Sequence, residues 1–390
     1  MDESRNLVLK PIRRVSPSRY TAMRSCLLRE AWTAAGNPPL LLPSPQAELG
    51  IVIHELLGAA GRGELEGGGH DRIERMWGDL VLQAEKRMAL SALQRHQVPL
   101  SRSIPDYEVR KLRVFHRAAE IAGVAVRGHV EWPKQGREHT GCEVWVESHD
   151  GQIGGYIDRA TMTAEGVVLF DYKSGVFLIS EKGACSRVVR RTYKEQLMLY
   201  AALYRSTFGV WPARLEVVPL QGAAVAVPFD AAEADGLFAD AIAFLQYANR
   251  RIAEVEIGRG TTTGLASPCS GNCRFCLFRP ACQAYWSART QGSKAKWPAD
   301  VRGVVHETTR LRNGKVCIRI AQSEQSEASC ITVRNLTDDI TRHPLLEKAQ
   351  PGSMVALYGL EHNYYTGDYA EMQNTVIYTG GDIQPAAPLS

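Results

Sequence analysis

Hydrophobic and polar positions alternate between residues 154 and 175 in the manner of two paired β-strands. The apolar run Val167–Phe170 marks the second strand, and Thr163–Gly166 has the composition of the turn that precedes it. The pattern therefore predicts a β-hairpin in the middle of the chain.

Helical spacing of apolar residues marks several other stretches. Near the N-terminus, Ser16 or Ser18 has the character of an N-cap, and a short amphipathic helix follows it. Residues 49–63 and 193–204 each predict a helix. Residues 62–140 predict a helical insert, which is a candidate cap over a site on the hairpin.

The pattern changes again after residue 286. Residues 287–299 are polar and contain proline, which predicts a linker. Residues 300–382 contain four or five short alternating stretches, with turns at Asn313–Gly314 and at 366–368. They predict a small all-β domain, for which an OB-fold is one candidate barrel.

Composition narrows the class of protein. A chain of 390 residues with 45% hydrophobic and 23% charged residues is long enough for two or three folded domains and is not a disordered type. The net charge of +4 permits a nucleic-acid partner without requiring one. The chain shows no signal-peptide core and no apolar run of membrane-spanning length, so we expect a cytoplasmic protein with no membrane partner.

The predicted hairpin carries an unusual set of charges. Because side chains alternate along a strand, Asp171 and Lys173 share one face, and the turn folds Asp158 back opposite Asp171. Two carboxylates on paired strands repel each other unless a cation lies between them, and Mg²⁺ or Mn²⁺ is the natural candidate. A lysine beside such a site could position a water or offset phosphate charge. An exposed hairpin with ordinary surface charges is the alternative.

Cysteines form a second group of candidate ligands. The chain has nine, an odd number without an export signal, which argues against a disulfide framework. Four lie close together, namely Cys269, Cys273, Cys276 and Cys282. This density favours a metal site. Zinc would use all four, whereas an iron–sulfur cluster could use three of them together with Cys26.

Three further polar features stand out. His54 lies in an apolar helical stretch, where it is either an ordinary core or surface residue or a metal ligand. Gln196 and Tyr200 are four residues apart and share a helix face, either as plain surface or as a hydrogen-bonding pair aimed at a phosphate or the lysine. Glu143 either adds a carboxylate or lies on a solvated strand edge.

Taken in order, these residues resemble the RecB-type branch of the PD-(D/E)xK nuclease superfamily. The family pattern is a helical histidine, then Gly-x-x-Asp, Asp-x-Lys and Gln-x-x-x-Tyr. The matching residues here are His54, Asp158, Asp171, Lys173, Gln196 and Tyr200. The resemblance implies that the histidine and both aspartates bind Mg²⁺ or Mn²⁺, that the lysine positions water and offsets charge, and that the last pair orients the strand or the lysine.

The cysteines are similar to those of iron–sulfur members of this branch, such as the AddB nuclease domain and the CRISPR adaptation nucleases. Those families bind a [4Fe-4S] cluster through one N-terminal Cys and a C-terminal Cys-x2-Cys-x5-Cys. The resemblance implies the ligands Cys26, Cys273, Cys276 and Cys282. The chain departs from the family at Leu27, where proline is common, and in having Cys269, which could replace Cys26 or make the site zinc.

The resemblance covers about residues 12–286. It implies an α/β fold, a restriction-endonuclease-like mixed sheet flanked by helices, with the cluster as a structural staple in a nuclease domain of residues 1–286. The implied function is a metal-dependent DNA nuclease, an exonuclease preferring single strands, in foreign-DNA defence or DNA repair. It would act alone or with a helicase or another defence protein. The alternative is a DNA-binding module with little or no cleavage, with zinc as the stabilising metal.

Aromatic and basic residues accompany each other in the C-terminal segment. They are Tyr364, Tyr365 and Tyr369 around the second turn, and Arg312, Lys315, Arg319 and Arg334 on other strands. Stacking tyrosines with interleaved basic residues are typical of single-strand binding by OB-folds. Packing of the tyrosines within the hairpin and binding of a protein partner are the alternatives.

Overall fold

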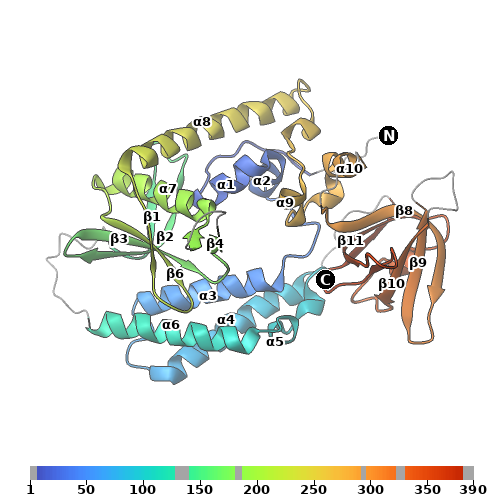
Figure 1. Ribbon diagram of the computed structural model, residues 1–390, viewed down its shortest axis with the longest axis horizontal. Helices are drawn as coiled ribbons and strands as arrows, with labels where there is room; N and C mark the ends of the chain where they lie inside the picture. The colour runs from blue at the N-terminus through green and yellow to red at the C-terminus, as the bar shows by residue number, and fades with distance from the viewer. Residues whose placement is uncertain (1–6, 128–139, 181–186, 291–295, 322–329, 381–390) are drawn as a thin grey trace.

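A computed structural model describes residues 7–127, 140–180, 187–290, 296–321 and 330–380. It has a mixed α/β body and a separate β-sheet formed by the C-terminal residues (Figure 1). The predicted mixed sheet with flanking helices is confirmed. No helix in the described ranges is long and apolar enough to cross a membrane.

The central sheet has five strands in the order β1-β2-β3-β6-β7. Their bounds are Gly141–Glu147, Gly154–Thr163, Gly166–Lys173, Arg214–Pro219 and Val225–Val227. Strands β3 and β6 run parallel, whereas the other neighbouring pairs are antiparallel. A two-stranded sheet, β4 (Leu178–Ser180) with β5 (Arg187–Val189), follows β3 in the chain.

Strands β2 and β3 form the predicted hairpin. Thr163 pairs with Gly166 across the turn, and Gly166 has a φ of 124°, which favours glycine. A Cβ added there would lie 3.1 Å from the Cβ of Ala213, so the position is also crowded. Because Arg159 pairs with Phe170, the register continues to bring Asp158 opposite Asp171.

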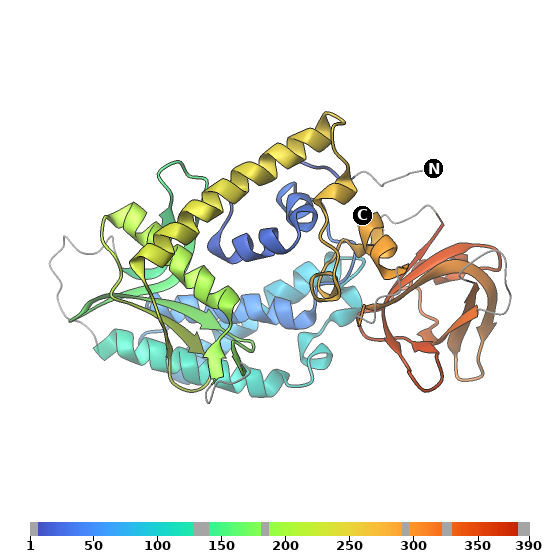
Figure 2. The ribbon, with the colours of Figure 1, turned by 45° about the horizontal axis from the view of Figure 1, so that its top comes forward.

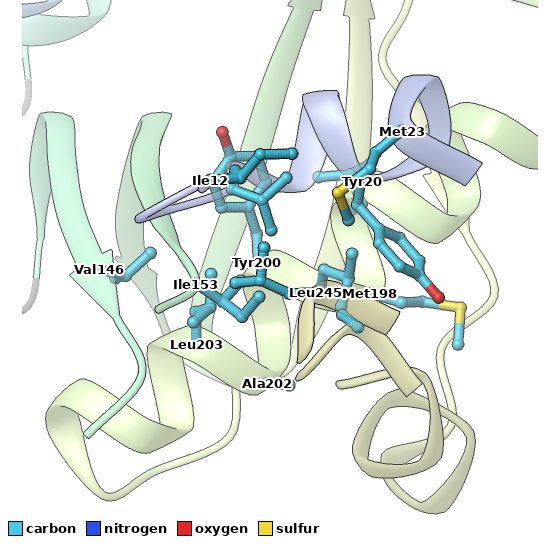
Figure 3. Close-up of a cluster of buried hydrophobic side chains, with 14 of the residues drawn as sticks. Ile12, Tyr20, Met23, Val146, Ile153, Met198, Tyr200, Ala202, Leu203 and Leu245 are labelled. Atoms are coloured by element: carbon cyan, nitrogen blue, oxygen red, sulfur yellow. The ribbon is translucent and has the colours of Figure 1, made fainter. Parts of the chain in front are cut away.

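One face of the sheet is covered by four helices. They are α1 (Pro17–Ser25), α2 (Leu27–Ala34), α7 (Arg191–Phe208) and α8 (Ala231–Glu256). Their apolar side chains form one buried cluster with those of the sheet, and Figure 3 shows Tyr20 of α1 and Leu203 of α7 in this cluster together with Val146 of β1. The Asp230 side chain caps the start of α8, and Gly209, at a φ of 78°, ends α7.

A second set of helices covers the opposite face (Figure 2). They are α3 (Pro45–Gly61), α4 (Gly69–Leu90), α5 (Leu100–Ser103) and α6 (Tyr107–Arg127), with the short 3₁₀ turn η1 (Arg95–Gln97). Tyr172 and Phe170 of β3 pack against this group. The predicted insert is therefore helical and forms a packed layer behind the sheet together with α3. Its last part, 128–139, lies outside the described residues.

The cysteine-rich segment follows α8 as short turns and helices. These are η3 (Thr262–Leu265), α9 (Ser270–Arg274), η4 (Arg279–Ala281) and α10 (Gln283–Thr290). Because α10 continues to Thr290, the beginning of the predicted linker is helical rather than extended, and residues 291–295 of that linker lie outside the described residues.

The C-terminal strands form a sheet that closes on itself. The strands are β8 (Ala299–Arg310), β9 (Lys315–Ala321), β10 (Cys330–Thr337), β11 (Met354–His362), β12 (Tyr369–Ala370) and β13 (Val376–Thr379), with η6 (Leu346–Lys348) before β11. The order is β12-β10-β9-β8-β11, and β12 also pairs with β11, which completes a ring. The predicted small β-domain is thus barrel-like. Residues 322–329 and 381–382 of its predicted range are outside the described part.

A shared apolar cluster joins this sheet to the α/β body. Tyr358 of β11 and Tyr378 of β13 are buried with Leu41, Tyr285 and Trp286. The barrel therefore packs against the segment that carries the cysteines.

Candidate active site

Asp171 and Lys173 meet at the end of β3. The Nζ of Lys173 lies 2.5 Å from Oδ2 of Asp171, and both side chains are largely buried. On the neighbouring strand, Oδ2 of Asp158 accepts a hydrogen bond of 2.6 Å from the backbone N–H of Tyr172. The hairpin thus brings together the two carboxylates and the ammonium, as the alternation predicted.

His54 approaches the hairpin from the opposite layer. Ser44 caps the start of α3, and this helix places the Nδ1 of His54 3.8 Å from Oδ2 of Asp158. Burial lowers the pKa of His54, and the positive charge of Lys173 adds to the shift. The ring is therefore held neutral at physiological pH, the form in which a histidine binds a metal.

Helix α7 supplies the other two predicted residues. The Nε2 of Gln196 donates a 3.0 Å hydrogen bond to Oδ1 of Asp171. Tyr200 lies in the hydrophobic core shown in Figure 3, and burial together with both carboxylates raises its pKa. A Cβ at Gly155 would lie 3.2 Å from the Tyr200 hydroxyl, so a glycine at this position allows close approach of α7 to β2. Gln196 thus contacts the carboxylate directly, and Tyr200 supports it from the core.

The two carboxylates are electrostatically strained. Burial raises the pKa of Asp171 to about 6, although Lys173 opposes the shift. Burial also raises the pKa of Asp158, against the stabilising backbone N–H of Tyr172. Partly desolvated carboxylates with raised pKa values are typical of sites that gain stability when a cation binds.

One neighbour, Tyr193, was not identified from the sequence, and another, Glu143, was left open there as a further carboxylate or a solvated edge residue. The ring of Tyr193 lies 4.9 Å from the Nζ of Lys173, a cation–π distance, and its position one turn before Gln196 on α7 was the available signal. Glu143 forms a 2.6 Å ion pair with Arg62, and its charge raises the pKa of Asp158. Glu143 is therefore near the site but is already paired with a cation.

The site contains the kinds of ligand atom that a hard cation prefers, but these atoms do not surround a common point at which a cation could bind. In the described ranges, no group of three or more His, Cys, Asp or Glu side chains is positioned to hold a metal ion. Lys173 occupies one side of Asp171, whose buried Oδ2 has no hydrogen bond of good geometry to any described residue. Carboxylate oxygens with a neutral histidine match the ligands of Mg²⁺ or Mn²⁺, so the residues fit such an ion.

Four of the cysteines line one pocket. They are Cys26, Cys273, Cys276 and Cys282. Cys26 is the residue of extended conformation between α1 and α2, and its side chain reaches the pocket from there. Burial raises the pKa of Cys273 to about 11 and that of Cys282 to about 12, and the neighbouring thiols add to both shifts. Such crowded, desolvated thiols fit a metal or cluster that binds them as thiolates.

Cys269 has a different role. It is exposed, and its Sγ accepts a hydrogen bond of 3.4 Å from the backbone N–H of Asn272 at the start of α9. It is absent from the residues that line the pocket. Of these two cysteines, Cys26 therefore lies with Cys273, Cys276 and Cys282, and Cys269 does not.

A buried ion pair connects the cysteine loop to the barrel. Arg279 donates hydrogen bonds of 3.0 Å to the carbonyl oxygens of Cys273 and Cys276, and its Nε lies 2.8 Å from Oδ2 of Asp300. The same carboxylate accepts from the Tyr285 hydroxyl at 2.7 Å and from the Gly359 N–H at 2.8 Å. Nothing in the local sequence pattern indicated this pair.

Two comparisons complete the description of the site. The model of the PD-(D/E)XK nuclease superfamily matches residues 14–283, a range that contains all ten predicted site residues and both groups described above. A search of curated proteins finds no match to the chain.

Proposed function

The chain belongs to the PD-(D/E)XK nuclease superfamily, whose members are typically metal-dependent nucleases, and we propose that it is a DNA exonuclease preferring single strands. The observation that carries this proposal is the grouping of Asp158, Asp171 and Lys173 at the end of the β2–β3 hairpin. Within the superfamily, we assign it to the RecB-type branch because His54 and Gln196 contact the two carboxylates.

In this proposal His54, Asp158 and Asp171 hold Mg²⁺ or Mn²⁺. A bound divalent cation supplies charge stabilisation at the phosphate and lowers the pKa of a water molecule. Binding requires Asp171 to be ionised, and its desolvated position makes the free carboxylate costly until a cation arrives.

Three further residues position the reacting groups or offset their charge. Lys173, next to Asp171, directs its ammonium at the attacking water or the developing phosphate charge. Gln196 fixes the orientation of Asp171 through its 3.0 Å hydrogen bond to Oδ1, so that Oδ2 faces Lys173. Tyr193 keeps the lysine side chain against its ring, which restricts the ammonium to the site.

We propose that the cysteine pocket holds a [4Fe-4S] cluster through Cys26, Cys273, Cys276 and Cys282. Such a group supplies coordination energy that links the first helices to the end of the α/β body, and hydrolysis needs no redox step. Arg279 holds two carbonyl groups of the loop in place for this purpose. Zinc in the same pocket is the alternative that metal analysis excludes or establishes.

Replacing Cys26 by serine is expected to remove most of the bound metal, because Cys26 lines the pocket whereas Cys269 is an exposed helix cap. The matched variant Cys269→Ser should keep the metal of the wild type. Iron and zinc per chain are measured after anaerobic purification, together with visible absorbance. Equal loss in both variants, or loss only in Cys269→Ser, would reverse the assignment. Zinc without iron in the wild type would reject the cluster.

The biological role that we propose is defence against foreign DNA or DNA repair, alone or with a helicase or another defence protein. Residues 1–390 contain no Gly-x4-Gly-Lys-Ser/Thr loop, so a motor would act from outside this segment.

The strand and end preferences are tested with four labelled substrates of one sequence. These are linear and circular single-stranded DNA, duplex DNA and RNA, each incubated with wild-type protein and Mn²⁺. We expect the linear single strand to shorten fastest and the circle to resist. Cleavage of the circle at a similar rate would show an endonuclease, and binding of all substrates without cleavage would establish the DNA-binding module instead.

A further inference from the structure

We infer that the outer face of the C-terminal barrel is a second binding site, which takes single-stranded nucleic acid by stacking bases on exposed tyrosines. The inference rests on the proposed function, since it places a strand-holding surface on the same chain as the hydrolytic site. It is carried by the loop between β11 and β12 and by the neighbouring strands β9 and β10.

The barrel meets the body through β8, β11 and β13, and through Arg342 and Gln373, which contact η1. Tyr358 of β11 and Val376 of β13 are buried against Trp286, and Arg302 of β8 lies over the same indole ring at 4.5 Å. Strand β9 lies on the side away from α9 and α10 (Figure 1). Five antiparallel and parallel strands closed in a ring are the arrangement of an OB-fold, whose corresponding face binds oligonucleotides. The docked side therefore leaves that face open.

The loop presents aromatic rings to solvent in a defined conformation. Tyr364 is 77% exposed and Tyr365 is 100% exposed. The side chain of Asn363 accepts hydrogen bonds from the backbone N–H groups of Tyr365, at 2.9 Å, and Thr366, at 3.4 Å. The exposure of two adjacent tyrosine rings is unfavourable in water, so this preorganised loop is suited to a ligand with flat apolar faces.

A row of rings continues from the loop into the barrel. The ring centroid of His362 lies 4.7 Å from that of Tyr364 and 4.6 Å from that of Tyr369. Tyr369 is half-buried and pairs in β12, so the row is anchored at one end and open at the other. The spacing of exposed rings on an anchored base is what stacking of successive bases requires.

The arginines on this face already form ion pairs with carboxylates. Arg334 of β10 contacts Asp368 at 2.7 Å, and Arg319 of β9 contacts Glu307 at 3.4 Å. Exposed pairs of this kind are weak, so a phosphate can replace the carboxylate as partner. We therefore expect the affinity to come mainly from stacking, with a shallow dependence on salt.

Fluorescence anisotropy of a labelled oligothymidine with the full chain in EDTA tests this site without cleavage. The double variant Tyr364→Ala/Tyr365→Ala should bind about ten- to hundredfold more weakly, whereas Tyr364→Phe/Tyr365→Phe should bind nearly as well as wild type. Tyr247→Ala, an exposed tyrosine on α8, is the matched control and should change nothing. Duplex DNA of the same sequence should bind less tightly than the single strand.

The inference fails if the double alanine variant binds within about twofold of wild type, or if duplex and single strand bind equally. The proposed function is judged separately by Mn²⁺-dependent cleavage. Weaker binding of the alanine variant without any cleavage by wild type would keep the barrel site and reject the nuclease. Unchanged binding of the alanine variant together with cleavage by the wild type would reject the barrel site and keep the nuclease.

Discussion

Asp171→Asn is expected to reduce Mn²⁺-dependent cleavage at least on the order of a thousandfold, about 4 kcal/mol of transition-state stabilisation. Asp171 is the central contact of the site, because its Oδ2 lies 2.5 Å from Lys173 Nζ and its Oδ1 accepts from Gln196. Asparagine keeps the size of the side chain but removes the charge that orients the lysine and that we propose as a ligand of the divalent cation.

The readout for this variant is the single-turnover rate on labelled single-stranded DNA, with binding measured in EDTA. Binding should persist, since the backbone and the barrel are unchanged. Asp235→Asn, which alters an exposed pair with Arg205, is the control and should cleave normally. More than a tenth of the wild-type rate in Asp171→Asn would show that this carboxylate is not the metal ligand.

The largest effect on stability is expected for Asp300→Ala, a loss of about 3–5 kcal/mol in the free energy of unfolding. The carboxylate is fully buried and receives hydrogen bonds from Arg279, Tyr285 and Gly359. Its removal leaves the guanidinium of Arg279 buried without a counter-charge, beside the carbonyl groups of the cysteine loop.

Urea denaturation of the full chain measures this loss, with the barrel and the body followed by separate probes because the chain has more than one unit. Asp338→Ala is the matched control, since Asp338 pairs with Arg310 on the surface, where about 1 kcal/mol or less is at stake. If the two variants unfold at the same denaturant concentration, the buried pair does not hold the barrel to the body.

Period-2 alternation was sufficient to predict the β2–β3 hairpin and the side chains that share its face. It placed Asp171 and Lys173 on one face and predicted the Thr163–Gly166 turn, because both follow from local geometry of a strand. The i, i+4 spacing of Gln196 and Tyr200 likewise predicted a shared helix face, although only Gln196 contacts the carboxylate. The superfamily resemblance is confirmed by the family match, and the RecB-type branch and the cluster stay predictions.

Contacts between distant segments could not be predicted in the same way. The Arg279–Asp300 pair depends on how the barrel docks, and the half-buried Tyr193 becomes a neighbour of Lys173 only when α7 packs on the sheet. The described part of the helical insert packs with α3 on the Phe170 side of β3, a contact that its periodicity alone does not give, and its role as a cap stays a prediction. Periodicity shows that a helix has an apolar face, but tertiary packing decides what that face meets.

We propose above all that the β2–β3 hairpin binds a divalent cation and hydrolyses phosphodiester bonds. The most direct measurement is the release of labelled nucleotide from linear single-stranded DNA by EDTA-stripped wild-type protein as Mn²⁺ is added, beside Asp171→Asn prepared identically. We expect no release before Mn²⁺, release that saturates with Mn²⁺ in the wild type, and almost none in the variant. Equal release by both proteins, or none by the wild type at any Mn²⁺ concentration, would contradict this proposal.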